Sequence, residues 1–148
     1  MARYLVTGGC GFIGSHLADA LVADGHEVRI LDDLSTGRRE NAPDSATIIV
    51  GDVSDAATVQ AAADGVDGIF HLAAIASVQK SNEDWAGTHR VNLTGAINVF
   101  DAARTASDGR PAPVVYVSSA AVYGDNPDVP LTEEAETRPL TAYGADKM

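Results

Sequence analysis

A glycine-rich turn that directly follows a short apolar segment constrains the fold of this chain more than any other feature. The segment 4–6 reads as a buried strand, glycines cluster within the run 7–14, and an apolar pattern with helical period begins at Phe12. The first amides of a helix point outward without partners, and its dipole is positive at that end. Glycine removes the side chains that would block an approaching ligand and permits a tight turn. This strand–loop–helix arrangement therefore predicts a diphosphate site at the start of the helix.

The next segment strengthens this interpretation. A Gly-x-Gly-x-x-Gly pattern over positions 9–14 is by itself weak, because many glycine turns bind nothing. The segment 27–31 then reads as a second strand that ends in Asp32 and Asp33, and Asp32 follows Gly14 by 18 positions. A ribose-binding carboxylate is expected after roughly 20 positions. Turn and acid together predict a dinucleotide site rather than a solvated acid at a strand end.

Length, charge and cysteine content exclude several classes of protein. A chain of 148 residues suits one domain, and its net charge of −11 opposes binding to nucleic acid or to an anionic membrane. No apolar run approaches the ~20 residues of a membrane span, and the N-terminus lacks the layout of a signal peptide. Cys10 is the only cysteine, which fits a small filler in the turn and a reducing compartment. We therefore expect a cytoplasmic protein.

Strand and helix patterns alternate along the chain, which predicts an α/β fold with a parallel sheet covered on both faces. Right-handed crossovers give the order 3-2-1-4-5, a doubly wound sheet of the Rossmann type that binds ligands at the carboxyl ends of strands one and four. Ser54 is the expected N-cap of the second helix, and the stretch 124–139, rich in proline and acids, is expected to serve a site. The expected strands are 3–7, 27–31, 47–50, 68–72 and 114–117, and the expected helices are 12–24, 54–63 and 83–107.

Polar and small residues at the predicted strand ends suggest further contacts. Asp52, at the end of strand three, could accept a hydrogen bond from an adenine amino group with Val53 against the ring, or it could simply begin a helix. Ala73 and Ala74, after strand four, let the backbone pass close to a flat ligand. His71 fits a buried core histidine without a chemical role. Ile13, Leu17 and Leu21 would form the apolar stripe of the first helix.

A serine, a tyrosine and a lysine follow strand five. Ser119 ends that strand, and Tyr143 and Lys147 would share one face of a helix over 142–148. A free phenol has a pKa near 10 and is a poor base at neutral pH. A lysine cation at ~4 Å could favour the phenolate by up to ~4 kcal/mol at an effective dielectric constant of 20. Tyr143 could then take a proton from a substrate hydroxyl while hydride leaves the same carbon, with Ser119 holding that oxygen.

These motifs together resemble the NAD-dependent epimerase/dehydratase family of extended short-chain dehydrogenases/reductases. The resemblance spans nearly the whole chain in the family's order, and within the family the motifs are most similar to nucleotide-sugar 4-epimerases. The matching segments are 7–16, 32–37, 51–53, 71–74, Asn92, 118–124, and Tyr143 with Lys147.

The resemblance implies a role for each matching residue. Asp32 would hold the adenosine ribose, and Lys147 would also hold the nicotinamide ribose. Ser119, Tyr143 and Lys147 would be catalytic. The full set of implied NAD contacts is Gly8, Gly11, Phe12, Ile13 and Gly14 at the pyrophosphate; Asp32, Asp33, Ser35, Thr36 and Gly37 at the ribose; Asp52 and Val53 at adenine; and Leu72, Ala73, Ala74, Asn92, Tyr143 and Lys147 at the nicotinamide.

The resemblance also implies an activity. Related dehydratases follow the catalytic hydroxyl residue with an Asp-Glu pair, whereas Ala120 and Ala121 stand here, which favours epimerisation at sugar C4 over dehydration. The expected substrate is a UDP-hexose, and the full-length enzyme is expected to be a homodimer. Residues 1–148 would form an incomplete NAD-binding domain that lacks the C-terminal substrate domain. A dehydrogenase or reductase of the same family, and a non-catalytic dinucleotide-binding fragment, remain alternatives.

Overall fold

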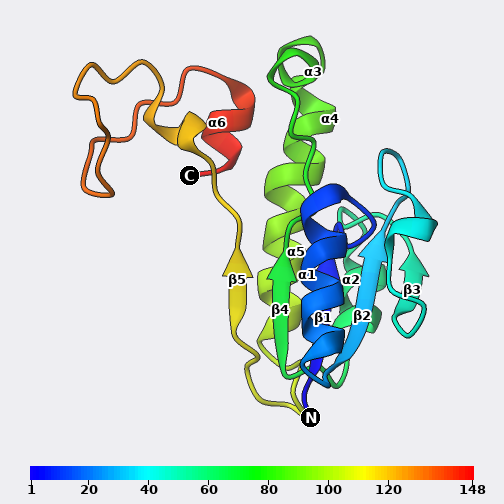
Figure 1. Ribbon diagram of the computed structural model, residues 1–148. Helices are drawn as coiled ribbons and strands as arrows, with labels where there is room; N and C mark the ends of the chain where they lie inside the picture. Colours follow the sequence, from blue (N-terminus) through cyan, green and yellow to red (C-terminus); the bar gives the residue numbers. More distant parts are fainter.

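A five-stranded parallel sheet forms the centre of the protein, whose computed structural model describes all 148 residues (Figure 1). The strand order is β3-β2-β1-β4-β5, which confirms the predicted doubly wound topology. In the register of the central strands, Val6 of β1 lies beside Ile30 of β2 and Phe70 of β4. The strands are β1 (Arg3–Thr7), β2 (Glu27–Asp32), β3 (Thr47–Val50), β4 (Gly68–His71) and β5 (Val114–Tyr116).

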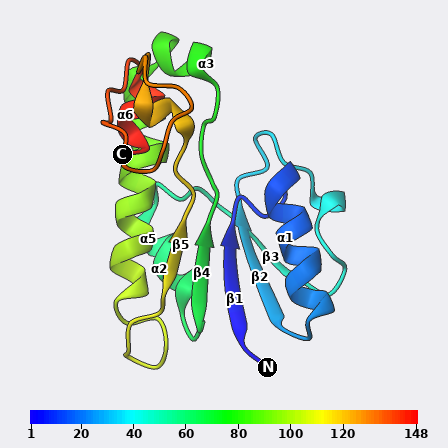
Figure 2. The same cartoon turned by 60° about the vertical axis from the view of Figure 1, so that its left-hand side comes forward.

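Helices cover both faces of the sheet, as Figure 2 shows. Successive side chains of a strand point to opposite faces of the sheet, so alternate residues of β1 belong to two different apolar clusters. Leu5 lies in the larger cluster under α2 and α5, and Val6 lies in the smaller one under α1. The helices are α1 (Phe12–Ala23), α2 (Ala56–Ala63), α3 (Val78–Glu83), α4 (Trp85–His89), α5 (Gly95–Ala103) and α6 (Ala142–Asp146), and the short helices are η1 (Arg39–Asn41), η2 (Arg90–Thr94) and η3 (Ala120–Tyr123).

The predicted helix over 83–107 is confirmed as one continuous helical segment over residues 85–103, which contains a single π-helical turn. The structure has α4, then the π-helical turn η2, then α5, and a separate α3 precedes them. Within η2, the buried Asn92 accepts a hydrogen bond from the Ile75 N–H and donates one to the Ile75 carbonyl. These two bonds tie the wider turn to the segment that follows β4.

Two smaller predictions also need correction. The N-cap of α2 is Asp55 and not Ser54, because the Asp55 carboxylate accepts the Ala57 N–H. Ile13 does not belong to the buried stripe of α1, since it is 64% exposed. Leu17 and Leu21 do pack against the smaller core cluster. The start of α1 thus faces outward, at the carboxyl end of the sheet.

The carboxyl ends of the strands, together with α3 and α6, lie at the end of the molecule opposite the N-terminus (Figure 1). The stretch 124–139 contains no helix or strand, as predicted, and the Arg138 N–H donates to the Val122 carbonyl at its base. No helix of the structure has both the length and the apolar character needed to cross a membrane.

Candidate functional site

A groove at the carboxyl ends of β1, β2, β3 and β4 collects most of the predicted cofactor residues. It lies at the switch point between β1 and β4, where doubly wound sheets bind ligands. Twelve predicted residues line it: Gly8, Gly11, Asp32, Asp33, Ser35, Thr36, Gly37, Asp52, Val53, Leu72, Ala73 and Ala74. The structure therefore brings together residues spread over 67 positions of the chain.

The glycine turn leaves the start of α1 open. Gly8 has φ +69°, and a Cβ there would lie 2.8 Å from the Ala73 nitrogen, so only glycine fits. No side chain caps the helix at Gly11. The amides of Phe12, Ile13 and Gly14 make no main-chain hydrogen bond, whereas the Ser15 amide bonds to the Gly11 carbonyl. Three unpartnered N–H groups without side-chain cover provide donors suited to a diphosphate.

Asp32 is held rigidly at the tip of β2. The Cys10 N–H donates to its Oδ2 and the Leu34 N–H to its Oδ1, both at 2.9 Å. Each carboxylate oxygen has a further lone pair, so both can still accept from ribose hydroxyls. The buried Cys10 thiol, predicted to be a filler, has its pKa raised by burial and by the Asp32 charge, and lowered by Arg39.

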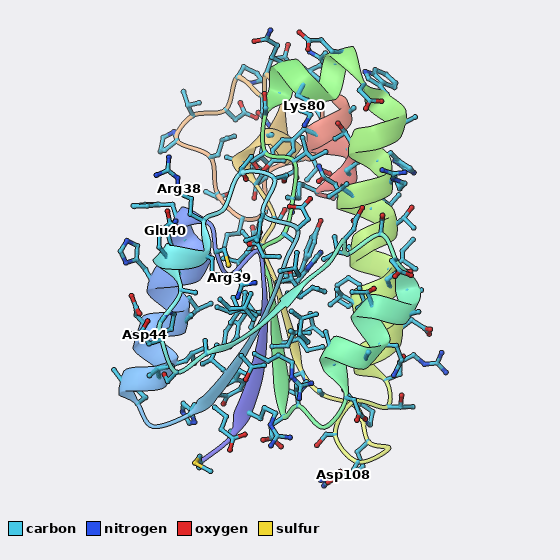
Figure 3. All side chains as sticks on the ribbon, turned by 90° about the vertical axis from the view of Figure 1, so that its right-hand side faces the viewer. Arg38, Arg39, Glu40, Asp44, Lys80 and Asp108 are labelled. Carbon is cyan, nitrogen blue, oxygen red and sulfur yellow. The ribbon has the colours of Figure 1, made fainter.

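The loop after β2 forms the outer wall of the groove. Asp33 is exposed, and its Oδ1 accepts hydrogen bonds from the N–H and the hydroxyl of Ser35. Figure 3 shows Arg38 and Glu40 on the outside of the following loop, with Arg39 turned toward the sheet. No lysine or arginine side chain lines the groove. Its side-chain charges are therefore the carboxylates Asp32, Asp33 and Asp52.

His71 is a core histidine, as predicted. Its Nδ1 lies 2.7 Å from the Thr7 hydroxyl, which also accepts the Ala73 N–H. The ring stacks on Tyr116, with centroids 5.9 Å apart. Burial lowers the pKa of His71 to about 4, and the nearby Lys147 charge acts in the same direction. His71 is therefore neutral near pH 7, and its partner Thr7 holds the loop after β4 by accepting the Ala73 N–H.

We expect His71 to make the stability of the fold depend on pH. Its pKa falls from 6.5 in the unfolded chain to about 4 in the folded one, so the unfolded chain binds the proton more tightly. The contribution of neutral His71 to the free energy of unfolding is thus fully present above about pH 6.5. It falls by about 3 kcal/mol as the pH falls to about 4. Urea unfolding across this range should show a shallower pH dependence in His71→Asn than in the wild type. The exposed His16→Asn serves as control, and an unchanged slope in His71→Asn would contradict the assignment.

Asn92 does not line the groove, although it was predicted to contact the nicotinamide side. It is fully buried, and its amide holds both main-chain groups of Ile75, which does line the groove. Asn92 therefore supports the wall from behind.

A second groove adjoins the first and holds the remaining predicted residues except Asn92 and Ser119. The two grooves share Gly8, Gly11, Leu72 and Ala74. The second is also lined by Phe12, Ile13, Gly14, Ala76, Val117, Tyr143 and Lys147. Tyr143 and Lys147 are thus brought to the diphosphate end of the first groove, on the side of β4.

The helix α6, which carries Tyr143 and has Lys147 as its C-cap, begins after Thr141, whose hydroxyl accepts the Gly144 N–H. The Lys147 ammonium was expected beside the Tyr143 phenol, but it donates to the Val117 carbonyl at 3.0 Å and lies 4.8 Å from the centroid of the Tyr116 ring. Burial lowers the pKa of Lys147, while the Asp146 charge raises it. A lowered pKa makes this lysine a readier proton donor than an exposed one.

Ser119 lines neither groove. It is the N-cap of η3, where its Oγ accepts the Ala121 N–H. η3 and α6 are in contact, so Ser119 lies near the helix of Tyr143 without a hydrogen bond to it. The catalytic roles of Ser119, Tyr143 and Lys147 stay predictions.

Sequence reasoning missed four residues that line the first groove: Leu31, Gly51, Ile75 and Val91. Each is adjacent in sequence to a residue that was predicted. Their position next to strand-end motifs was the available signal. Val91, which is next to Asn92, is the exception to this signal, because it lies in the π-helical turn η2 and not at a strand end.

Comparisons with known proteins agree with this geometry. A family model described as the NAD dependent epimerase/dehydratase family matches residues 4–148. The chain is 40% identical to the UDP-glucose 4-epimerase of Corynebacterium glutamicum over 150 residues, which are 99% of the chain and 44% of that protein.

Solved structures show the same relation. A Thermus thermophilus UDP-glucose 4-epimerase in complex with NAD is 40% identical, with a TM-score of 0.89 over 98% of this chain and 47% of that one. A UDP-N-acetylglucosamine 4-epimerase from Methanobrevibacter ruminantium, in complex with UDP-N-acetylmuramic acid, is 38% identical with the same TM-score, over 99% and 47%. The chain thus spans less than half the length of the relatives it matches.

Proposed function

This chain belongs to the NAD-dependent epimerase/dehydratase family, and from that membership we propose that it is the NAD-binding part of a nucleotide-sugar 4-epimerase acting on a UDP-hexose. One observation carries the proposal: a single groove collects the open turn, the β2 acids and the small residues after β4. The relatives named above are 4-epimerases, and one of them was solved with NAD.

The residues of the groove fit a dinucleotide. The free amides of Phe12, Ile13 and Gly14 would bind the diphosphate, because no side chain covers them. Asp32 would accept the ribose hydroxyls with its remaining lone pairs. Val53 and Asp52 would contact adenine, and the alanines after β4 would lie against the nicotinamide side.

The reaction that this site supports is transient oxidation at C4 of the sugar. Bound NAD would supply the acceptor and donor of hydride. Tyr143 would take the proton of the C4 hydroxyl and return it when the ketone is reduced on its other face. The buried Lys147 ammonium lines the same groove and would stabilise the phenolate electrostatically, while Ser119 would hold the sugar oxygen.

Epimerisation is favoured over dehydration by the residues after Ser119. Ala120 and Ala121 begin η3, so no carboxyl acid–base pair stands there to eliminate water. A dehydrogenase or reductase of the same family is a second candidate, because the same three residues would serve it. A non-catalytic dinucleotide-binding role is a third candidate for the 148 residues by themselves.

Exposed apolar residues support the further proposal that the full-length enzyme is a homodimer. Ile97 and Phe100 project from α5 with half of their surface exposed, and Val115 is exposed on β5. Exposed apolar side chains on a helix and on the edge strand suit contact with another protein surface.

We expect NAD to bind at least about fivefold more tightly than NADP. A 2′-phosphate ~4 Å from the β2 carboxylates would cost about 1–4 kcal/mol, depending on the effective dielectric. Calorimetric titration of both coenzymes measures the ratio. Asp33→Asn should reduce it, because the substitution keeps the Oδ1 acceptor for Ser35 and removes the charge. Asp44→Asn, on the outer loop in Figure 3, is the matched control. Equal affinities in the wild type would contradict the proposal.

The decisive experiment for the reaction uses a protein of epimerase length that carries these residues. Interconversion of UDP-glucose and UDP-galactose without release of free NADH is the expected result. Stoichiometric release of NADH would favour the dehydrogenase, and NAD binding without turnover of any nucleotide sugar would favour the non-catalytic role.

A further inference from the structure

The helix α6 is too short to hold its own position. It has five residues, and isolated helices of that length are marginal in water. It nevertheless carries Tyr143 and ends at Lys147, which line the second groove. Contacts with the rest of the fold must therefore fix where these two side chains point.

The first set of contacts comes from the end of β5. The Tyr116 hydroxyl donates to the Asp146 carbonyl at 3.1 Å, and the Ser118 hydroxyl donates to the Lys147 carbonyl at 2.7 Å. In return, the Lys147 ammonium donates to the Val117 carbonyl. These three bonds fix the C-terminal end of α6 against the sheet.

A second contact comes from α4, on another side of α6. His89 Nδ1 lies 2.8 Å from Asp146 Oδ1. The Asp146 side chain is only 5% exposed, whereas that of His89 is 57% exposed. Asp146 Oδ2 is also buried and has no hydrogen-bonding partner in the protein. A buried carboxylate that is only half satisfied is costly unless a cation compensates its charge.

The cation nearest in sequence is Lys147, which is itself 2% exposed. His89 of α4 contacts Asp146, and Tyr116 of β5 contacts both Asp146 and Lys147. His71 of β4 stacks on Tyr116, and Tyr143 lines the second groove together with Lys147. His71 is neutral, because its pKa lies at about 4. Burial lowers the pKa of Lys147 and the Asp146 carboxylate opposes this effect.

We propose that Asp146, held in place by His89, is a positioning residue for Lys147: it anchors α6 to α4, and its buried negative charge, next in sequence to the lysine, favours the ammonium form of Lys147 in the second groove. Only the expected effect on turnover rests on the proposed function. The electrostatic part concerns the chain as it stands and can be tested without substrate.

The test uses the small number of lysines. Lys80 and Lys147 are the only two, and Lys80 is exposed near the outer end of α3 (Figure 3). With 15N-labelled lysine, the ζ-nitrogen resonances of both can be titrated in one NMR sample. Asp146→Asn keeps the size of the side chain and removes its charge. It should lower the titration midpoint of Lys147 by about one pH unit and leave Lys80 unchanged.

Asp101→Asn is the matched control, because it removes an exposed carboxylate from an ion pair with Arg104 on α5. It should leave the Lys147 midpoint where it is in the wild type. An unchanged Lys147 midpoint in folded Asp146→Asn would overturn the proposal. In a protein of epimerase length, Asp146→Asn should lower kcat with little change in KM. If no nucleotide sugar is turned over at all, the proposed function fails while the titration still decides the role of Asp146.

His89 provides a second variant should Asp146→Asn not fold. His89→Ala removes the tether, so the ammonium protons of Lys147 should exchange with solvent faster than in the wild type. His89→Gln retains an N–H donor within reach of Asp146 and should restore slow exchange. Equal exchange rates in the wild type, His89→Ala and His89→Gln would overturn the anchoring part of the proposal.

Discussion

Replacing Tyr143 by phenylalanine is expected to lower kcat about a thousandfold in a protein of epimerase length that carries these residues. Phenylalanine keeps the ring in the groove and removes the hydroxyl that would exchange a proton with the sugar. General acid–base groups contribute typically 10²–10⁴-fold, which sets the expected size of the effect. The measurement is the steady-state rate of interconversion of UDP-galactose and UDP-glucose, with NAD affinity titrated in parallel.

Tyr123→Phe is the matched control for Tyr143→Phe. Tyr123 lies in η3, lines neither groove, and loses the same hydroxyl in this variant. Its kcat should stay close to that of the wild type, and both variants should retain NAD affinity. A Tyr143→Phe enzyme with more than about a tenth of the wild-type rate would show that another group transfers the proton.

Gly14→Ala is expected to disrupt both the fold and the cofactor site. A Cβ at this position would overlap the Gly8 carbonyl oxygen and lie 2.8 Å from the Cα of Gly9. Both neighbours are main-chain atoms of the turn, so they cannot move without opening it. Overpacking of this kind costs about 1–3 kcal/mol, which corresponds to a loss of about 3–10 °C in Tm. Displacement of the turn should also abolish measurable NAD binding in a calorimetric titration.

Gly109→Asn is a suitable control for Gly14→Ala. Gly109 also has a positive φ, of +79°, but a Cβ there would meet no atom within 4 Å, and asparagine tolerates this backbone conformation. Its Tm and NAD affinity should stay near those of the wild type. If Gly14→Ala bound NAD as tightly as the wild type, the turn could not be the diphosphate site.

The sheet was predictable because its signals are local. Each strand is a short apolar run, and the alternation of strand and helix, combined with right-handed crossovers, leaves few possible orders. The π-helical turn within this helix was not predictable, because it is tied to hydrogen bonds between Asn92 and Ile75, 17 positions apart. Apolar periodicity also predicted that Ile13 is buried, although it is exposed at the second groove.

The residues of the candidate site were likewise predictable where the signal is local, and not where their contacts depend on packing between distant segments. Residues within strand-end motifs, such as Asp32 and Ala73, were predictable because the carboxyl ends of parallel strands meet at one edge of the sheet. Helical spacing placed Tyr143 and Lys147 on one helix. It could not show that the Lys147 ammonium turns to the Val117 carbonyl, since that contact depends on how α6 packs against β5.

The π-helical turn η2 sets the angular phase between the two ends of the long helical segment. Each helical residue adds a rotation of about 100°, and a π-turn accommodates one residue more than an α-turn. Without that additional residue, His89 would be rotated by about 100° relative to Val99, which packs in the core on α5. His89 would then point away from Asp146. The wider turn thus allows one helical segment to present its apolar side to the sheet and, beyond the turn, a different side to α6.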